Sequence, residues 1–254
     1  MTGFRAFLAK EFAETMHTWR IWVLPGFLLF SAISSPILTY FTPALMDALG
    51  SQGTGIAITV PDPTASAAYL EYIGNLFELV MLAMVIAYGG IVNSEVRSGT
   101  GALTLAKPLS RHAFVLGKWV SQLAVLLVAA SLATAVCVGV TAVVLDSGPA
   151  LALVAAAGLW FAYAVLMLSV MVLLSVAFRA PAAASGAGVG AYLSLVVLGQ
   201  FPRLAEVTPA ELPTAATDRI QGIPAIWVTP LLTTVVASLV LLLAALWLFS
   251  RREI

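Results

Sequence analysis

Between Glu95 and Lys118 the chain reads EVRSGTGALTLAKPLSRHAFVLGK, a polar stretch that lies between two long apolar segments. Four of the chain's basic residues belong to it: Arg97, Lys107, Arg111 and Lys118. Glycine and proline interrupt it repeatedly, whereas the flanking segments read as long helices. The apolar segments therefore determine the fold, and this polar island is the main candidate for the functional element.

The composition indicates that lipid is the solvent for most of the chain. Of 254 residues, 61% are hydrophobic and 9% are charged. A soluble domain has about 25% charged and about 45–50% apolar residues. An all-α membrane protein is therefore expected, and a soluble globular domain is excluded. The single cysteine, Cys137, lies in an apolar run and is expected to be buried, and His17 and His112 are too far apart to predict a metal or catalytic pair.

Six apolar segments are close to the roughly 20 residues that a helix needs to cross a bilayer. They lie at about 22–41, 73–92, 120–145, 151–178, 182–201 and 226–249. The first contains Pro25 and Pro36 and lacks a small-residue cleavage site, so it is interpreted as a retained span and not as a signal peptide. The predicted organisation is an interfacial helix over residues 1–20 and a six-span transmembrane domain over 21–254.

The N-terminal segment shows helical periodicity. Phe4, Leu8, Phe12 and Met16 recur every four residues, with charged side chains on the other faces. This pattern predicts an amphipathic helix in the membrane interface, and the alternative is a short soluble helix.

Two further boundaries are predicted from proline. Pro36 is expected to kink or end the first span, and a connector rich in glycine, serine, threonine and proline is expected from Pro43 to Tyr69. Asp62 followed by Pro63 predicts an N-cap and a first helical turn leading into the second span.

The placement of basic residues predicts the orientation. Six spans put both termini on one side, and that side would hold ten basic residues, whereas the other would hold only Arg203 and Arg219. Basic residues are concentrated on the cytoplasmic side of membrane proteins. A multi-pass protein of the cell membrane with both termini in the cytoplasm is expected.

Within the polar island, the residues predict a helix, a short transverse helix and a second helix. Gly99 and Gly101 are expected to break the first helix, and residues 102–106 can form one or two turns anchored by Leu103. Pro108 would stop those turns, and Ser110 is expected to cap a new helix that starts at Arg111. The alternative is an ordinary loop.

These motifs resemble a known family. The stretch Glu95-Val-Arg-Ser-Gly-Thr100, the later Lys-Pro-Leu-Ser-Arg111 and the final Gly117-Lys118 are similar to the signature of ABC transporter type-2 permeases. The amphipathic N-terminus, the six spans and the long outer segment before the last span also match, although Gly101-Ala102 replaces a bulkier apolar pair.

The resemblance implies that the loop is a coupling helix seated in a cleft of a nucleotide-binding subunit. The residues that would make this contact are Glu95, Arg97, Gly99, Thr100, Leu103, Pro108, Ser110 and Arg111. It also implies a permease of an ATP-driven exporter and pairing with a second copy or a homologue. No nucleic-acid partner is expected.

The chain lacks a phosphate-binding loop of its own. Gly117-Lys118 is followed by Trp119 and has no glycine five residues upstream, so it is not the G-x-x-x-x-G-K-[ST] motif. The chain is therefore not expected to be an enzyme or to bind a cofactor or metal, and ATP and magnesium would bind the partner subunit.

Two pairs of residues within the spans are further candidates. Asn75 and Glu78 would line a substrate path, since a carboxyl at membrane depth is costly, although a shallow, hydrated Glu78 is the alternative. Gly186 and Gly190 form a small-xxx-small pair that would let another helix approach, as at a dimer interface.

Three other functions remain open from the residues. A self-powered secondary transporter or channel would place ionisable residues at the membrane midplane, and Glu78 is the one candidate for that role. A non-transporting membrane sensor or scaffold could keep the same architecture. An intramembrane enzyme would need converging histidines or carboxylates, which the sequence does not offer.

Overall fold

The computed structural model describes residues 7–8, 10–13, 20–50, 62–97 and 110–251. These residues form helices and connectors and no strand. Six helical segments are long and apolar enough to cross a membrane, which confirms the predicted all-α membrane fold. They are Trp22–Ala48, Ala65–Arg97, Arg111–Val144, Ala150–Ala177, Pro181–Leu198 and Val228–Ser250.

The second and fourth spans form the centre of the bundle. In each of them 67% of the most apolar window is buried, compared with 17–33% in the other four. The fourth span is α8 (Ala150–Ala177), and it buries Trp160 and Tyr163 completely or nearly so. Helices α7 (Arg111–Val144), α9 (Pro181–Leu198) and α12 (Val228–Ser250) pack against it. Their outer faces carry exposed apolar side chains, as expected for contact with lipid.

The first span is longer than predicted. Helix α2 runs from Arg20 to Gly50 and includes Pro25, Pro36 and Pro43, so the span does not end at Pro36, and the prediction of a connector from Pro43 is wrong. Proline is tolerated within membrane helices because neighbouring helices and hydroxyl side chains satisfy the freed backbone groups. Within α2, Thr39 Oγ1 also donates to the Ser35 carbonyl at 2.9 Å and Thr42 Oγ1 to the Leu38 carbonyl at 2.7 Å, so both hydroxyls are satisfied by the helix backbone.

The second span is assembled from several pieces. Helix α3 (Ala65–Asn75) continues into a π-helical turn, η1 (Leu76–Val80), and then into α4 (Met81–Tyr88) and α5 (Asn93–Arg97). The N-cap of α3 is Thr64, whose hydroxyl accepts a hydrogen bond from Ala67 N at 3.2 Å, so the predicted cap at Asp62 is wrong by two residues. The whole segment is much longer than the predicted span of 73–92.

Helix α7 begins where the sequence predicts, and a short turn follows it. Helix α7 begins after Ser110, whose hydroxyl accepts from Ala113 N at 3.1 Å, which confirms the predicted cap. A short turn at Asp146 joins α7 to α8, and Asp146 has a φ of 72°. Cys137 is buried within α7, as expected.

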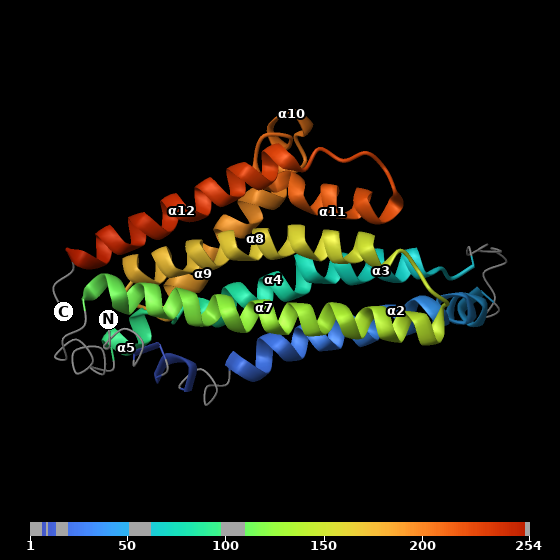
Figure 1. Ribbon diagram of the computed structural model, residues 1–254, viewed down its shortest axis with the longest axis horizontal. Coiled ribbons are helices and arrows are strands. Elements are labelled where there is room, and N and C mark those ends of the chain that lie inside the picture. Colours follow the sequence, from blue (N-terminus) through green and yellow to red (C-terminus); the bar gives the residue numbers. More distant parts are fainter. Residues whose placement is uncertain (1–6, 9, 14–19, 51–61, 98–109, 252–254) are drawn as a thin grey trace.

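The segment between the fifth and sixth spans is folded and does not form a simple polar connector. It contains α10 (Pro202–Ala205), a 3-10 turn η2 (Pro209–Glu211) and α11 (Leu212–Gln221), which ends at Gly222 with a φ of 72°. Helix α11 packs beside α8 and α3 (Figure 1). Its buried residues are Leu212, Ala215, Ala216 and Ile220, so a moderately polar sequence still covers one end of the central helices.

Candidate functional site

The structure describes only part of the predicted docking loop. Glu95 and Arg97 belong to α5, and Ser110 and Arg111 begin α7, so the two edges of the loop are placed. Gly99, Thr100, Leu103 and Pro108 lie outside the described residues, as does most of the predicted interfacial helix. The two edges lie at the same end of the bundle as the end of α12, and Arg111 Nη1 donates to the Ser250 carbonyl at 3.1 Å (Figure 1).

A buried ion cluster joins the two edges of the loop to the N-terminal segment. Lys118 Nζ lies 3.0 Å from Glu11 Oε2 and also contacts Glu95 Oε1. Lys118 and Glu11 are each only 4% exposed. Charged side chains that are almost completely excluded from solvent are stable only when they are paired with opposite charges. This Lys118 cluster, Glu11, Glu95 and Lys118, therefore ties the end of the second span, the start of the third and the N-terminal segment together.

Aromatic side chains enclose the cluster. The Phe7 and Phe114 rings are 5.8 Å apart, and Phe114 stacks on Phe249 of α12 at 5.6 Å. The Phe114 ring also lies 5.1 Å from Lys118 Nζ. A Cβ at Gly117 would lie 2.4 Å from the Phe7 ring, so glycine is needed at this position for Phe7 to approach. The pair Gly117-Lys118 thus has a local structural role.

Sequence reasoning missed the part that Glu11 plays in this cluster. Glu11 lies four residues after Phe7, which places it on the same side of a helix as that apolar residue. An acid on the apolar side of an interfacial helix is the signal that could have indicated a buried cation partner. Its partner is 107 residues further along the chain, which local patterns do not indicate.

The π-helical turn in the second span is held by two side chains from neighbouring spans. Trp160 Nε1 of α8 donates to the Leu76 carbonyl at 2.8 Å, and the Tyr192 hydroxyl of α9 donates to the Phe77 carbonyl at 2.8 Å. A π-turn disturbs the regular backbone hydrogen bonds, and such turns are frequent at functional sites. The second, fourth and fifth spans are thus joined at the level of this turn.

The structure separates the two predicted substrate-path residues. Asn75 Nδ2 donates to Ser35 Oγ of α2 at 3.1 Å and to Glu71 Oε1 at 3.5 Å, so it faces the first span. Glu78 is exposed and lines a cavity of about 180 Å³ between the π-turn, α8, α9 and the segment that joins α9 to α12. It makes no ion pair with any described residue. The two residues therefore do not share one site within this chain.

Gly186 and Gly190 lie on the outward face of α9. Both are exposed, and a Cβ at either would meet nothing within 4 Å. Gly188, between them, faces inward, where a Cβ would lie 2.3 Å from Met171 Sδ and 2.9 Å from Val85 Cγ1. Gly188 allows close packing within the chain, whereas Gly186 and Gly190 leave this part of the outward face of α9 without side chains.

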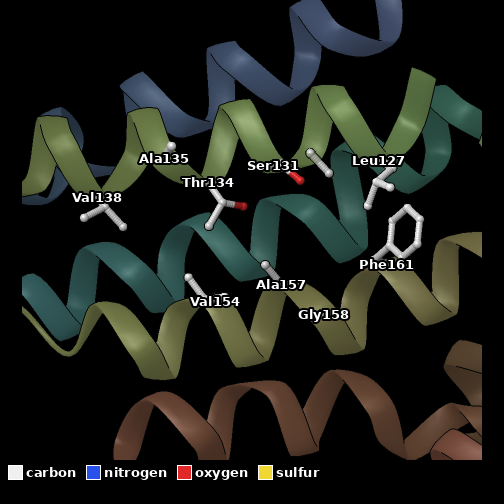
Figure 2. Close-up of a pocket in the computed structure, with 10 residues that line it drawn as sticks. Leu127, Ser131, Thr134, Ala135, Val138, Val154, Ala157, Gly158 and Phe161 are labelled. Atoms are coloured by element: carbon white, nitrogen blue, oxygen red, sulfur yellow. The ribbon is translucent and has the colours of Figure 1, made fainter. Parts of the chain in front are cut away.

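A larger groove of about 380 Å³ lies between α7 and α8. Figure 2 shows Leu127 and Phe161 at one end of this groove and Val138 and Val154 toward the other. Its lining is almost entirely apolar, and the hydroxyl of Thr134 is already 3.3 Å from that of Tyr72. The groove offers apolar contact without a charge, and no group of three potential metal ligands occurs in the part of the chain that the structure describes.

Comparison with known proteins identifies the family of the chain. The family model described as "ABC-2 family transporter protein" matches residues 5–254, and the chain belongs to this family. It is therefore a multi-pass membrane protein of a transport family. One relative is the "Uncharacterized transmembrane protein YxlG" of Bacillus subtilis (strain 168), which is 22% identical over 209 residues, 82% of this chain and 81% of the relative.

Proposed function

We propose that this chain is the permease subunit of an ATP-driven exporter, and that a separate ATPase subunit docks on the loop from Glu95 to Lys118. The observation that carries the proposal is the match to the ABC-2 transporter family over nearly the whole chain. The lack of a phosphate-binding motif in the sequence supports a separate source of ATP hydrolysis. ATP and magnesium would then bind the partner.

The Lys118 cluster supports the route by which the loop acts on the spans. Lys118 follows the loop and Glu95 precedes it, and the two side chains are in contact. A push on the loop would therefore move the ends of the second and third spans together. Arg111 and Phe114 pass the same displacement to α12 through Ser250 and Phe249. Tightly packed elements re-pack as semi-rigid units, and such motion can open a path on one side of the membrane.

The orientation follows the basic residues. Among the described residues, Arg97, Arg111, Arg179 and Arg251 lie at the helix ends beside the Lys118 cluster. Basic residues favour the cytoplasmic side. The proposal therefore places that end, the termini and the ATPase in the cytoplasm of a cell with the chain in its cell membrane.

A second copy, or a homologue, would complete the transport path. The outward face of α9 supports this assignment because Gly186 and Gly190 leave room for a helix to approach closely. Changing both to leucine should weaken dimers measured by cross-linking and by mass in nanodiscs. Gly139→Leu, at an exposed glycine of α7 where a Cβ would also meet nothing within 4 Å, is the matched control. Dimers that persist unchanged in the double variant would remove α9 from the interface.

The ATPase proposal is tested by co-expressing the chain with a candidate ATPase and measuring co-purification and ATP turnover. Arg97→Glu should reduce both, because it reverses an exposed charge at the edge of the docking loop. Arg179→Glu makes the same change on an exposed residue in the connector between α8 and α9, and it should reduce them less.

Three results would favour another function. Equal effects of the two variants would remove the 95–118 loop as the docking site. Transport by the chain alone, driven by an ion gradient, would indicate a secondary transporter or channel. A complex whose ATP turnover produces no transport of any tested cargo in proteoliposomes would indicate a sensor or scaffold.

A further inference from the structure

Glu78 belongs to the π-helical turn of the second span. The span runs from Ala65 to Arg97, and Glu78 is 13 residues after its start and 19 before its end. A carboxylate within a membrane-spanning helix is costly, and such groups are usually retained for a function.

The cavity beside Glu78 is aromatic and polar and carries one acid. Its wall includes Phe77, Tyr163 and Tyr192, and the Phe77 and Tyr163 rings are 5.5 Å apart in an edge-to-face contact. Gln200 and Thr214 add polar groups from the outer segment. None of the residues that line the cavity is basic, so the negative charge of Glu78 is not neutralised from within it.

This combination distinguishes among ligand classes. A hard metal ion requires several oxygen ligands, whereas the cavity has one carboxylate. A neutral apolar molecule would gain nothing from a carboxylate in the cavity wall. Aromatic rings beside one carboxylate match a cation that is large and weakly hydrated, which gains from both ring electrons and charge.

We propose that the cavity formed by Glu78, Phe77, Tyr163 and Tyr192 binds a small organic cation, such as a quaternary or protonated amine. The π-turn shapes this site. The carbonyls of Leu76 and Phe77 accept hydrogen bonds from Trp160 and Tyr192, and these bonds fix one wall of the cavity next to the Glu78 side chain.

The outer segment covers this cavity and supplies an approach for cations. Ala210, Pro213 and Thr214 of η2 and α11 line it. The same segment carries Glu206, Glu211 and Asp218, which lie close enough for their negative charges to influence one another. A group of acids at the entrance raises the local concentration of cations. That the bound cation is the exported substrate rests on the proposed transport function, whereas its binding does not.

The experiment measures equilibrium binding of radiolabelled choline to the purified full chain in nanodiscs, without ATP or any ATPase. Saturable binding is expected. Glu78→Gln should weaken it about tenfold or more, through loss of the carboxylate. Glu71→Gln makes the same change on an exposed acid of the same span outside the cavity, and it should leave binding unchanged.

A second measurement uses the unaltered chain, so it does not depend on how a variant folds. Unlabelled choline should displace the label, whereas 3,3-dimethylbutan-1-ol, its uncharged carbon analogue, should compete at least about tenfold more weakly. Absence of saturable binding to the folded chain, equal competition by the uncharged analogue, or equal loss in both variants would each overturn the proposal. ATP-dependent export that persists after such a result would leave the transport function standing and remove only the cation site.

Discussion

Two of the three carboxylates of the second span, Glu95 and Glu78, lie in contrasting surroundings. Glu95, at the end of the span, contacts Lys118, which in turn pairs with Glu11. Glu78, near the middle, makes no ion pair with a described residue and faces a cavity. A charge whose partner is built into the chain fixes the positions of the elements that carry it. A charge that faces an aromatic cavity is instead available to a ligand.

The contrast extends to the backbone around each acid. Near Glu95, Val92 N and Asn93 N donate to Ser175 Oγ of α8 at 2.9 and 3.1 Å, so the base of α5 is attached to the central helix. Around Glu78 the helix is widened into a π-turn, and its carbonyls are held by Trp160 and Tyr192. The first arrangement suits transmission of force, and the second suits formation of a binding site.

The largest expected effect comes from removing the shared cation of the cluster. Lys118→Met should destabilise the protein by about 3–5 kcal/mol, because the buried Glu11 and the partly buried Glu95 lose their common partner. Glu78→Gln should change stability by less than about 1 kcal/mol in either direction, since it removes a charge that has no built-in partner. Unfolding in mixed detergent micelles, followed by tryptophan fluorescence, measures both.

Arg179→Met controls for loss of a basic residue at the same end of the bundle, because Arg179 is exposed. A Glu78 variant as unstable as the Lys118 variant would break the comparison. It would mean that Glu78 has a structural partner after all.

The π-turn offers an intermediate effect. Trp160→Phe keeps an aromatic ring but removes the donor to the Leu76 carbonyl, and it should cost about 1–3 kcal/mol. It should also weaken cation binding, since the wall beside Glu78 is then less firmly held. Trp22→Phe is the control, because Trp22 is 77% exposed. Lost stability with unchanged cation binding would separate the π-turn from the site.

The sequence allowed prediction of those features that depend on residues close together in the chain. Apolar length located six spans, and Ser110 was recognised as an N-cap because its partner, Ala113 N, is three residues away. The polar island also pointed to the family. In each of these cases the physical cause lies within one helical turn or one span.

What could not be predicted depends on residues far apart. The length of α2 was underestimated because proline rules from water do not hold where neighbouring helices satisfy the backbone. The π-turn depends on Trp160 and Tyr192, which are 84 and 115 residues from the carbonyls they bind. The contribution of Glu11 to the Lys118 cluster has the same origin. A pattern of local hydrophobicity contains no information on such pairs.

The smallest effect concerns the acids at the entrance. Burial, followed by the negative charges of Asp218 and Glu206, raises the pKa of Glu211 above its ordinary value of 4.5. The folded protein therefore holds this proton more tightly than the unfolded chain, and stability falls as the pH rises from the ordinary pKa toward the raised one. Glu211→Gln removes that loss and should stabilise the protein by less than about 1 kcal/mol at about pH 7, with the gain fading toward about pH 4.

Melting temperatures of the two proteins across this pH range measure the gain. Asp62→Asn makes the same change of charge on an exposed acid ahead of α3 and separates a local effect of Glu211 from a general effect of net charge.

The same Glu211 variant sharpens the comparison of the two carboxylates, because the entrance acids act on a cation only at a distance. At low salt the Glu211 variant should bind choline at Glu78 slightly more weakly than the unaltered chain, and the difference should disappear as added salt screens the entrance acids. A loss as large as that of Glu78→Gln, unaffected by salt, would instead place the cation at Glu211 and leave the aromatic cavity without a ligand.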